Sequence, residues 1–146
     1  MFKHTLYSDK VTINASREEV WTLLTDLDGY RDWNPFTNPV IGTLEIGAPV
    51  ELHVKMPLRG DRVSTEYVQS ADIDGGLAWG MTMGAKWLLV ARRDQKLEAI
   101  DDQHCSYQTW DAFSGLLTPL VVRLFGKDML KGFNAVAYAL QDRFSR

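Results

Sequence analysis

The sequence has little cysteine and no long uncharged apolar stretch. Its one cysteine, Cys105, excludes an internal disulfide and favours a reducing compartment. No uncharged run approaches the roughly 20 residues that a membrane-spanning helix requires, and the first residues contain no apolar signal core. The sequence therefore predicts a cytoplasmic protein.

The sequence also has no excess of positive charge, and its histidines are few. The net charge is −3 and no basic cluster stands out, which argues against nucleic-acid binding, because that needs a strong positive field. His4, His53 and His104 are scattered without the spacing of a zinc site, so we predict no metal ion and no cofactor. The sequence also lacks a G-x-S-x-G elbow, a phosphate loop and a dinucleotide fingerprint, which leaves ordinary hydrolase and nucleotide chemistry without support.

The composition is that of one globular domain. A length of 146 residues suits a single domain, and 45% hydrophobic with 24% charged residues allow a sizeable core. We find no repeat, low-complexity tract or linker-like segment. The predicted domain therefore spans residues 1–146.

Residues 119–144 form the longest segment with a helical period. Its apolar side chains recur at steps of three and four residues and share one face: Val122, Phe125, Met129, Phe133, Val136, Leu140 and Phe144. Pro119 suits the first helical position, and Thr118 could cap the free amides. A helix of about 39 Å needs a broad partner such as a sheet. Gly126 and Gly132 each cost about 1 kcal/mol inside a helix relative to alanine; they could leave room for a ligand, allow a bend or be incidental.

The rest of the chain reads mainly as strands. A strand is predicted at residues 6–15, and a capping box at residues 16–19 starts a short helix. Further alternating segments, separated by turn residues, are predicted as strands at residues 40–46, 50–56, 62–71, 77–83, 87–100 and 104–114. Short turns between strands indicate an antiparallel meander. The order strand, helix, strands, long helix is typical of an α+β domain with helices on one side of a curved sheet.

The last predicted hairpin brings two charged residues together. A turn at residues 101–103 sets Arg93 directly opposite Asp111. The other face of this hairpin is polar apart from Trp110, so Arg93 and Asp111 belong to the apolar face that points at the long helix. Charges removed from water cost several kcal/mol each unless they are paired. The register therefore predicts that these two side chains are paired.

Several motifs together resemble a known superfamily. They are INASREEVWTLLTDLDGYRDWNPF, LAWG, DAFSGLLTPL and GFNAVAYAL, and they extend from about Val11 to the C-terminus. The chain resembles the SRPBCC superfamily of START-like, Bet v1-like helix-grip proteins, and DWNPF and FSGLL resemble its polyketide cyclase/dehydrase-like branch. The resemblance implies a curved antiparallel sheet of about seven strands wrapped around the C-terminal helix. It also implies two short helices between strands 1 and 2, and a deep apolar cavity.

The resemblance further implies a polar centre in that cavity. The branch often has an acidic residue before the FSG-like turn, with histidines on that strand and its neighbour. The acidic position here is Asp111, but the histidine positions hold Arg93 and Thr109, so imidazole-based chemistry has no support. Because a guanidinium suits a carboxylate, enolate or phenolate, Arg93 and Asp111 could anchor a ligand or act as electrophile and acid. The alternative is a structural pair that fixes the sheet register.

The other candidate ligand-binding residues are apolar or lie on the aromatic turn after the first helix. Methionine and aromatic side chains suit a pocket for varied apolar ligands, and equally a plain core. Those on the predicted inner walls are Trp79, Met81, Met83, Tyr107, Phe113, Met129 and Phe133. Trp33, Asn34 and Phe36 could form a lid at the cavity mouth, or a plug in which Asn34 satisfies the turn. Cys105 is expected to be a small core residue rather than a nucleophile.

Three functions are compatible with this fold. The first is binding of a small hydrophobic molecule (a lipid, polyketide or aromatic compound) whose polar head meets Arg93 and Asp111. The second is a polyketide cyclase- or aromatase-like enzyme in which Asp111 moves protons and Arg93 steadies an enolate. The third is a protein-interaction module with a filled cavity; a volume under roughly 100 Å³ would favour it, because drug-sized ligands need about 300 Å³ or more. The oligomeric state stays open, and Trp110 on an outer face is the one hint of a homodimer.

Overall fold

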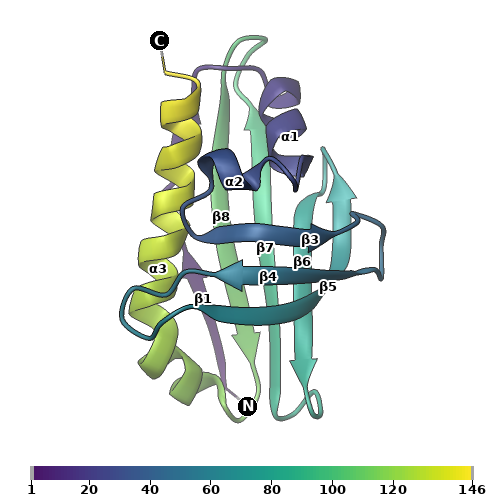
Figure 1. The fold of residues 1–146 in the computed structure, drawn as a ribbon, viewed down its shortest axis with the longest axis vertical. Coiled ribbons are helices and arrows are strands. Elements are labelled where there is room, and N and C mark those ends of the chain that lie inside the picture. The colour runs from purple at the N-terminus through teal and green to yellow at the C-terminus, as the bar shows by residue number, and fades with distance from the viewer. Residues whose placement is uncertain (1, 146) are drawn as a thin grey trace.

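One antiparallel sheet faces one long helix (Figure 1). The computed structural model describes residues 2–145, so Met1 and Arg146 at the ends of the predicted domain lie outside the described residues. The elements in chain order are β1 (Lys3–Tyr7), β2 (Val11–Ile13), α1 (Arg17–Thr25), α2 (Tyr30–Trp33), β3 (Thr37–Gly42), β4 (Pro49–Val54), β5 (Arg62–Asp72), β6 (Gly76–Met83), β7 (Leu89–Ala99), β8 (Cys105–Ser114) and α3 (Thr118–Arg143). This arrangement confirms the predicted α+β helix-grip architecture.

The sheet runs in the order β1-β8-β7-β6-β5-β4-β3, and β2 also pairs with β8. β1 and β2 therefore share one edge, and the strand predicted at residues 6–15 is interrupted. At the interruption, the Ser8 amide donates to the carbonyl of Thr109 at 2.8 Å, and the Thr109 amide donates to Ser8 Oγ at 3.0 Å. The sheet is strongly bent, because β6, β7 and β8 run along α3 whereas β3, β4 and β5 cross in front of them (Figure 1). The bend creates two walls facing the helix.

The hairpin of β7 and β8 has the predicted register. Arg93 is paired with Asp111 along the backbone, and most side chains on the Arg93 parity are buried, while Asp111 itself is half-buried. Trp110 lies on the outer face, where its ring packs 5.9 Å from the ring of Tyr7 on the neighbouring edge strand. Cys105 is buried in the core, as its parity predicts.

α1 and α2 cover the end of the sheet at which α3 ends (Figure 1). α1 begins with the predicted capping box, in which the Glu19 amide donates to Ser16 Oγ at 3.1 Å and that hydroxyl donates to the Glu19 carboxylate at 3.2 Å. The hydroxyl of Tyr30, in α2, donates to the carbonyl of Leu24 at 2.5 Å. That bond ties the short second helix to the first.

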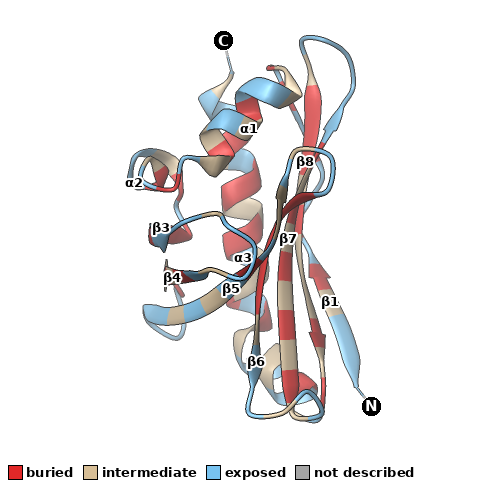
Figure 2. Cartoon of the chain, turned by 90° about the vertical axis from the view of Figure 1, so that its right-hand side faces the viewer, coloured by how far each residue is buried: buried red, intermediate tan, exposed pale blue. Residues whose placement is uncertain are grey.

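α3 begins one residue earlier than predicted, and its apolar face is buried to different degrees along the helix. Most buried residues of α3 lie in its C-terminal half (Figure 2). Phe133 and Leu140 are buried there, whereas Phe125 and Met129 in the N-terminal half are only half-buried. Thr118 does not cap the helix: its hydroxyl is buried and finds no hydrogen-bond partner among residues 2–145. Among these residues no helix combines the length and the apolar character needed to cross a membrane.

The two helical glycines differ in what surrounds them. A Cβ on Gly132 would lie 2.0 Å from Cδ1 of Phe36, so the missing side chain makes room for that ring. A Cβ on Gly126 would meet only Cγ1 of Val122, at an ordinary 3.5 Å. Gly132 therefore fixes how closely Phe36 approaches α3, while nothing in the packing requires a glycine at position 126.

Candidate functional site

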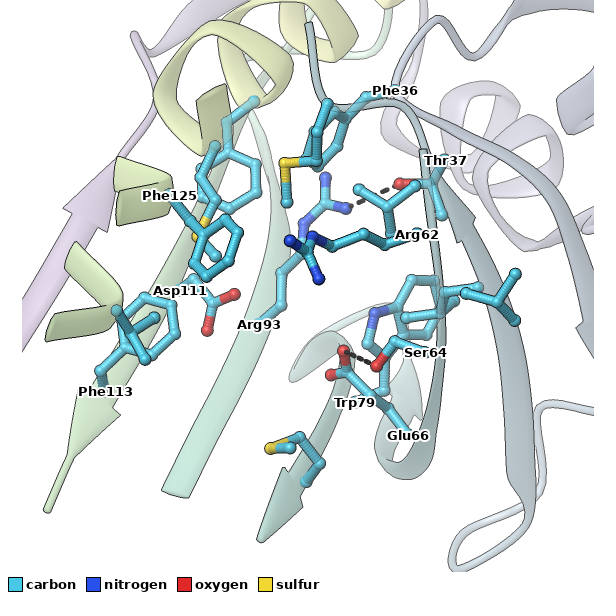
Figure 3. A pocket seen from close by; sticks show the side chains of 18 of the residues that line it. Phe36, Thr37, Arg62, Ser64, Glu66, Trp79, Arg93, Asp111, Phe113 and Phe125 are labelled. Carbon is cyan, nitrogen blue, oxygen red and sulfur yellow. Dashed lines mark hydrogen bonds between the residues drawn. The ribbon is translucent and has the colours of Figure 1, made fainter. Parts of the chain in front are cut away.

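A cavity of about 350 Å³ lies between the bent sheet and the N-terminal half of α3 (Figure 3). Residues predicted for the site that line it are Phe36, Trp79, Met81, Met83, Arg93, Asp111, Phe113, Met129 and Phe133. Lining residues that the sequence did not single out are Thr37, Leu52, Val54, Met56, Arg62, Val63, Ser64, Glu66, Leu89, Val121 and Phe125. The wall is mainly apolar, and its polar groups come from β3, β5, β7 and β8.

Arg93 is buried at the centre of this wall. Its Nε donates to Thr109 Oγ1 at 3.1 Å, and its Nη1 donates to Thr37 Oγ1 at 3.3 Å. The guanidinium carbon lies 4.8 Å from the ring centre of Phe133 and 5.8 Å from that of Phe36, within the range of a cation–π contact. Among the residues that the structure describes, none accepts a hydrogen bond from Nη2. Two threonine hydroxyls and two aromatic rings thus hold the guanidinium, while Nη2 has no hydrogen-bond partner within residues 2–145.

The predicted pairing of Arg93 with Asp111 is wrong, although their register is right. Within residues 2–145 no ion pair joins the two side chains, and Asp111 Oδ1 is buried without a hydrogen-bond partner. Figure 3 shows why: Arg93 extends toward Phe36 and Thr37, away from the Asp111 carboxyl. Thr37 lies on a strand that the pairing argument did not include.

Asp111 is a much weaker acid than an ordinary aspartate, because its pKa is raised. Burial raises its pKa to about 8, and the negative charges of Glu66 and Asp94 add to the increase, while Arg93 opposes it. The carboxyl is therefore mostly protonated at neutral pH. In that form it can donate as well as accept a hydrogen bond.

Glu66, on β5, is a second acid in the same cavity. Burial raises its pKa to about 7, against the positive charge of Arg93 and a hydrogen bond from Ser64 Oγ at 3.4 Å. Its parity places Arg62 and Ser64 beside it on the cavity side (Figure 3). Arg62 is exposed, and its guanidinium carbon lies 4.5 Å from the ring centre of Phe125, which links β5 to α3.

Four predicted site residues do not line the cavity: Trp33, Asn34, Tyr107 and Thr109. Asn34 Oδ1 accepts hydrogen bonds from the amides of Phe36 and Thr37, both at 2.9 Å, so it shapes the turn. Trp33 packs edge-on against Tyr30, with 5.1 Å between the ring centres. Tyr107 donates to Gln95 Oε1 at 2.5 Å in the buried core, on the same face of the sheet as Arg93, and Thr109 accepts a hydrogen bond from Arg93. Of the turn residues 33–36, Phe36 alone reaches the cavity among those predicted, and it does so as a buried wall rather than a lid.

A carboxylate on α3 holds the loop between β4 and β5. Asp128 is buried, and its two oxygens accept hydrogen bonds from the amides of Leu58 at 3.0 and 3.1 Å and of Arg59 at 3.1 Å. Arg59 Nε donates in turn to the carbonyl of Leu124 at 3.1 Å. The sequence carries a signal for this tether, because an acid at position 128 interrupts the apolar face between Phe125 and Gly132. Among the described residues no group of His, Cys, Asp and Glu side chains could hold a metal ion.

Comparison with known proteins identifies the family of this chain. The family model described as polyketide cyclase / dehydrase and lipid transport matches residues 4–141. The chain belongs to this family. A search of curated protein sequences found no significant match.

Solved structures with the same fold include proteins of very different kinds. The Zhui aromatase/cyclase from Streptomyces sp. R1128 is 20% identical with a TM-score of 0.74, covering 97% of this chain and 93% of its own. A START superfamily protein from Mycobacterium smegmatis is 17% identical with a TM-score of 0.70, covering 97% of each chain. Norcoclaurine synthase from Thalictrum flavum, in complex with dopamine and hydroxybenzaldehyde, is 14% identical with a TM-score of 0.70, covering 97% of this chain and 86% of its own. The resemblance to the START-like superfamily is thereby confirmed, and at these identities it concerns the fold alone.

Proposed function

We propose that this polyketide cyclase/dehydrase and lipid transport family member binds a small hydrophobic molecule with a polar head in the cavity beneath α3. The supporting observation is the combination of an apolar wall with Arg93 Nη2 and Asp111 Oδ1, which find no protein partner within residues 2–145. Leaving a buried polar group unsatisfied costs about 1–3 kcal/mol. A ligand head that bonds both atoms would remove this cost and fix the orientation of the apolar body.

The volume of the cavity supports ligand binding over a filled interaction module. About 350 Å³ exceeds the roughly 300 Å³ at which pockets begin to hold drug-sized molecules. Methionine side chains at Met81 and Met129 can adapt to different apolar shapes. The cavity therefore suits one molecule of moderate size.

A cyclase-like enzyme is the second candidate, and a specific observation favours it. Asp111 and Glu66 line one apolar cavity with pKa values of about 8 and 7, where general acids and bases work best near neutral pH. In that mechanism Asp111 transfers a proton to or from a keto substrate, and the guanidinium of Arg93 stabilises the enolate oxygen. The same geometry therefore serves binding and proton transfer.

Native mass spectrometry of freshly purified protein tests the binding proposal directly, since a retained ligand adds its own mass. For added ligand, the neutral fluorophore N-phenyl-1-naphthylamine is a suitable probe. We expect Met129→Trp, which fills part of the cavity, to weaken its binding strongly. Leu120→Trp is the matched control, because Leu120 is exposed on the same helix and does not line the cavity. Equal probe binding by both variants would refute the proposed location.

Substitution of Asp111 distinguishes the binding function from the enzymatic one. If the protein is an enzyme, Asp111→Asn abolishes turnover of a keto substrate while binding persists. If it is only a binder, the wild-type protein shows no turnover, and Arg93→Gln weakens binding of a polar-headed ligand.

A further inference from the structure

We propose that the ligand is an apolar carboxylic acid, bound as its carboxylate, and that binding is coupled to proton uptake by Glu66 and Asp111. This inference deepens the ligand-binding function and rests on it. It depends on the balance of charge within the cavity, on two unsatisfied buried atoms, and on two carboxyl groups that make no ion pair with Arg93 within residues 2–145.

The cavity contains a cation that has no counterion among residues 2–145. The guanidinium of Arg93 is that cation, and its hydrogen bonds go to two neutral threonine hydroxyls. A buried charge without an opposite partner is costly. An anionic ligand head that accepts from Nη2 would provide the missing charge.

The remaining groups that face this cation make an anion more favourable. From β5 come Arg62 at the rim and Glu66, and from β8 comes Asp111, while α3 presents apolar lining residues. The buried acid of α3, Asp128, is occupied by loop amides. With both cavity acids protonated, the charges that face the cavity are therefore positive.

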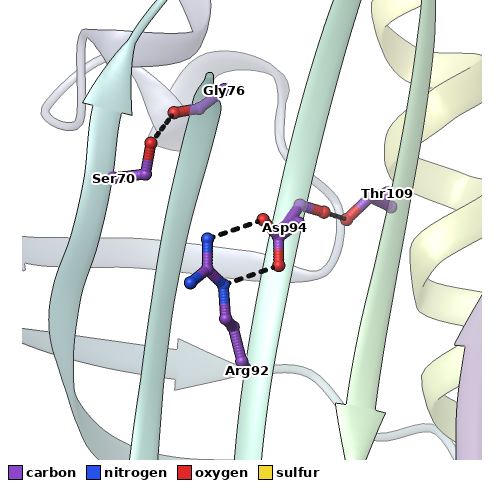
Figure 4. A network of polar contacts seen from close by, with 5 residues as sticks. All are labelled: Ser70, Gly76, Arg92, Asp94 and Thr109. Atoms are coloured by element: carbon purple, nitrogen blue, oxygen red, sulfur yellow. Dashed lines mark hydrogen bonds and ion pairs between the residues drawn. The ribbon is translucent and has the colours of Figure 1, made fainter.

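The acid on the outer face of β7 has its own partner. Arg92 Nε and Nη2 donate to the two carboxylate oxygens of Asp94 at 2.9 and 3.1 Å (Figure 4). Asp94 is therefore paired with Arg92, and within residues 2–145 it forms no ion pair with Arg93. The neighbouring Arg92 is the natural control for Arg93, because it carries the same charge on the same strand but faces away from the cavity.

The two acids become donors when the ligand arrives. Their pKa values of about 7 and 8 leave Glu66 about half protonated and Asp111 mostly protonated at pH 7, and the added negative charge of a carboxylate raises both pKa values further. Protonated Asp111 then donates to one carboxylate oxygen while Arg93 Nη2 donates to the other. A carboxylate has the two acceptor oxygens that this pair of donors requires, whereas a phenolate or an alcohol has one.

The coupling determines how affinity changes with pH. An acid with a pKa near 8 is about nine-tenths protonated at pH 7 and about one-tenth protonated at pH 9. If the protonated form binds the carboxylate, affinity falls about tenfold between these pH values. A cationic ligand would behave in the opposite way, because it would favour the ionised acids.

Isothermal titration calorimetry with three probes of one shape tests the proposal: 2-naphthoate, 2-naphthalenemethanol and 2-naphthylmethylamine. Naphthoate stays ionised from pH 6.5 to 9, so changes in its affinity report the protein. We expect naphthoate to bind at least tenfold more tightly than the alcohol at pH 7, and at least tenfold more weakly at pH 9 than at pH 7, because Glu66 adds to the effect of Asp111. Repeating the pH 8 titration in buffers of different ionisation enthalpy should give an uptake of about half a proton by Asp111 and nearly one more by Glu66.

Variants locate the effect. Asp111→Asn places a neutral donor at the same position, so naphthoate binding should persist with a flatter pH profile, and Glu66→Gln should flatten the remainder. Arg93→Gln should remove the preference for naphthoate over the alcohol, Arg93→Lys should retain it, and Arg92→Gln should leave it unchanged. Equal affinity for naphthoate and the alcohol, or naphthoate affinity that does not fall with pH, would overturn the proposal while the binding function stands. Failure of all three probes and of N-phenyl-1-naphthylamine would overturn both.

Discussion

Asp111 is held in its protonated form by its surroundings rather than by a hydrogen bond. Its carboxyl is buried, Glu66 lies in the same cavity, and the guanidinium of Arg93 is directed elsewhere. The first two effects raise the pKa of Asp111, and the third removes the contact that would have lowered it most. A carboxyl in this state destabilises the fold when it ionises, which gives its titration a measurable effect on stability.

We expect the Asp111→Asn variant to change the pH dependence of stability. The folded-state pKa of about 8 exceeds the usual unfolded value, so the folded state binds more protons and stability is lost as pH rises toward 8. The slope from one such group is at most about 1.4 kcal/mol per pH unit. Asp111→Asn should therefore gain roughly 2 kcal/mol relative to wild type between pH 6 and pH 8.

Urea denaturation of both proteins at pH 5, 6.5 and 8 measures this difference. Asp102→Asn, at an exposed position in the turn between β7 and β8, is the control and should follow the wild-type curve. Parallel stability curves for wild type and Asp111→Asn would show that the Asp111 carboxyl is already ionised at neutral pH in the folded protein.

The position of Arg93 and Asp111 was predictable, but their side-chain partners were not. Backbone register depends on turn length and on alternation within one hairpin, and both can be read locally. The partner that draws Arg93 away from Asp111 is Thr37, which is 56 residues distant along the chain. When tertiary structure brings alternative hydrogen-bond partners together, neither segment carries a sequence pattern that shows which partner is bound.

At the level of whole elements, β5 shows where alternation misleads. Tyr67 is 51% exposed and is not part of the cavity lining, whereas Arg62 and Glu66, on the other parity, line the cavity. The rule that the more apolar face points inward holds where the interior is filled by protein. The rule fails at the wall of a cavity, because polar side chains can face the cavity when they are hydrogen-bonded or uncharged. Glu66 could therefore not be identified from its strand alone.

The packing of Phe36 against α3 supports a second prediction. Gly132→Ala would bring a methyl group to 2.0 Å from Cδ1 of Phe36 and force the ring toward the cavity. We expect a loss of about 1–3 kcal/mol despite the better helix propensity of alanine. Gly126→Ala, in ordinary contact with Val122, should instead gain about 0.5–1 kcal/mol.

Thermal or urea unfolding of the two variants checks the sign of each change. Adding Phe36→Leu to Gly132→Ala should recover part of the loss, since the smaller side chain relieves the overlap. If both alanine variants were stabilised, the contact between Gly132 and Phe36 would not limit the approach of the turn to α3.

The Asp128 tether supports a third prediction. Asp128→Ala removes the acceptor for the amides of Leu58 and Arg59, so the loop between β4 and β5 should open more often. We expect faster hydrogen exchange at those amides and a loss of about 1–3 kcal/mol in the free energy of unfolding. Lys127→Ala, at an exposed neighbouring position, is the control. Unchanged exchange rates would mean that the loop is held without the carboxylate.

For the molecule as a whole, the architecture was readable from sequence and the cavity was not. Strand alternation, turn residues and the long helical period all indicate one arrangement, and each is a local pattern. A cavity is a place where packing is incomplete, and a periodic apolar face looks the same over a filled core as over a space. In α3 one continuous face is buried at Phe133 and half-buried at Phe125. The family resemblance therefore added the expectation of a cavity, which periodicity could not provide.

Incomplete packing makes the stability of the whole molecule depend on its ligand. A ligand that binds only the folded state stabilises it by about 2.7 kcal/mol at a concentration one hundred times its Kd. We expect N-phenyl-1-naphthylamine at that concentration to raise the melting temperature of the wild-type protein. Met129→Trp should melt at a higher temperature than wild type without probe, because the larger side chain fills part of the cavity, and should show no further rise with probe. Differential scanning calorimetry of both proteins, with and without probe, measures these melting temperatures. A probe-induced rise that persists in Met129→Trp would place the binding site outside the cavity beneath α3, since Met129 is part of its lining.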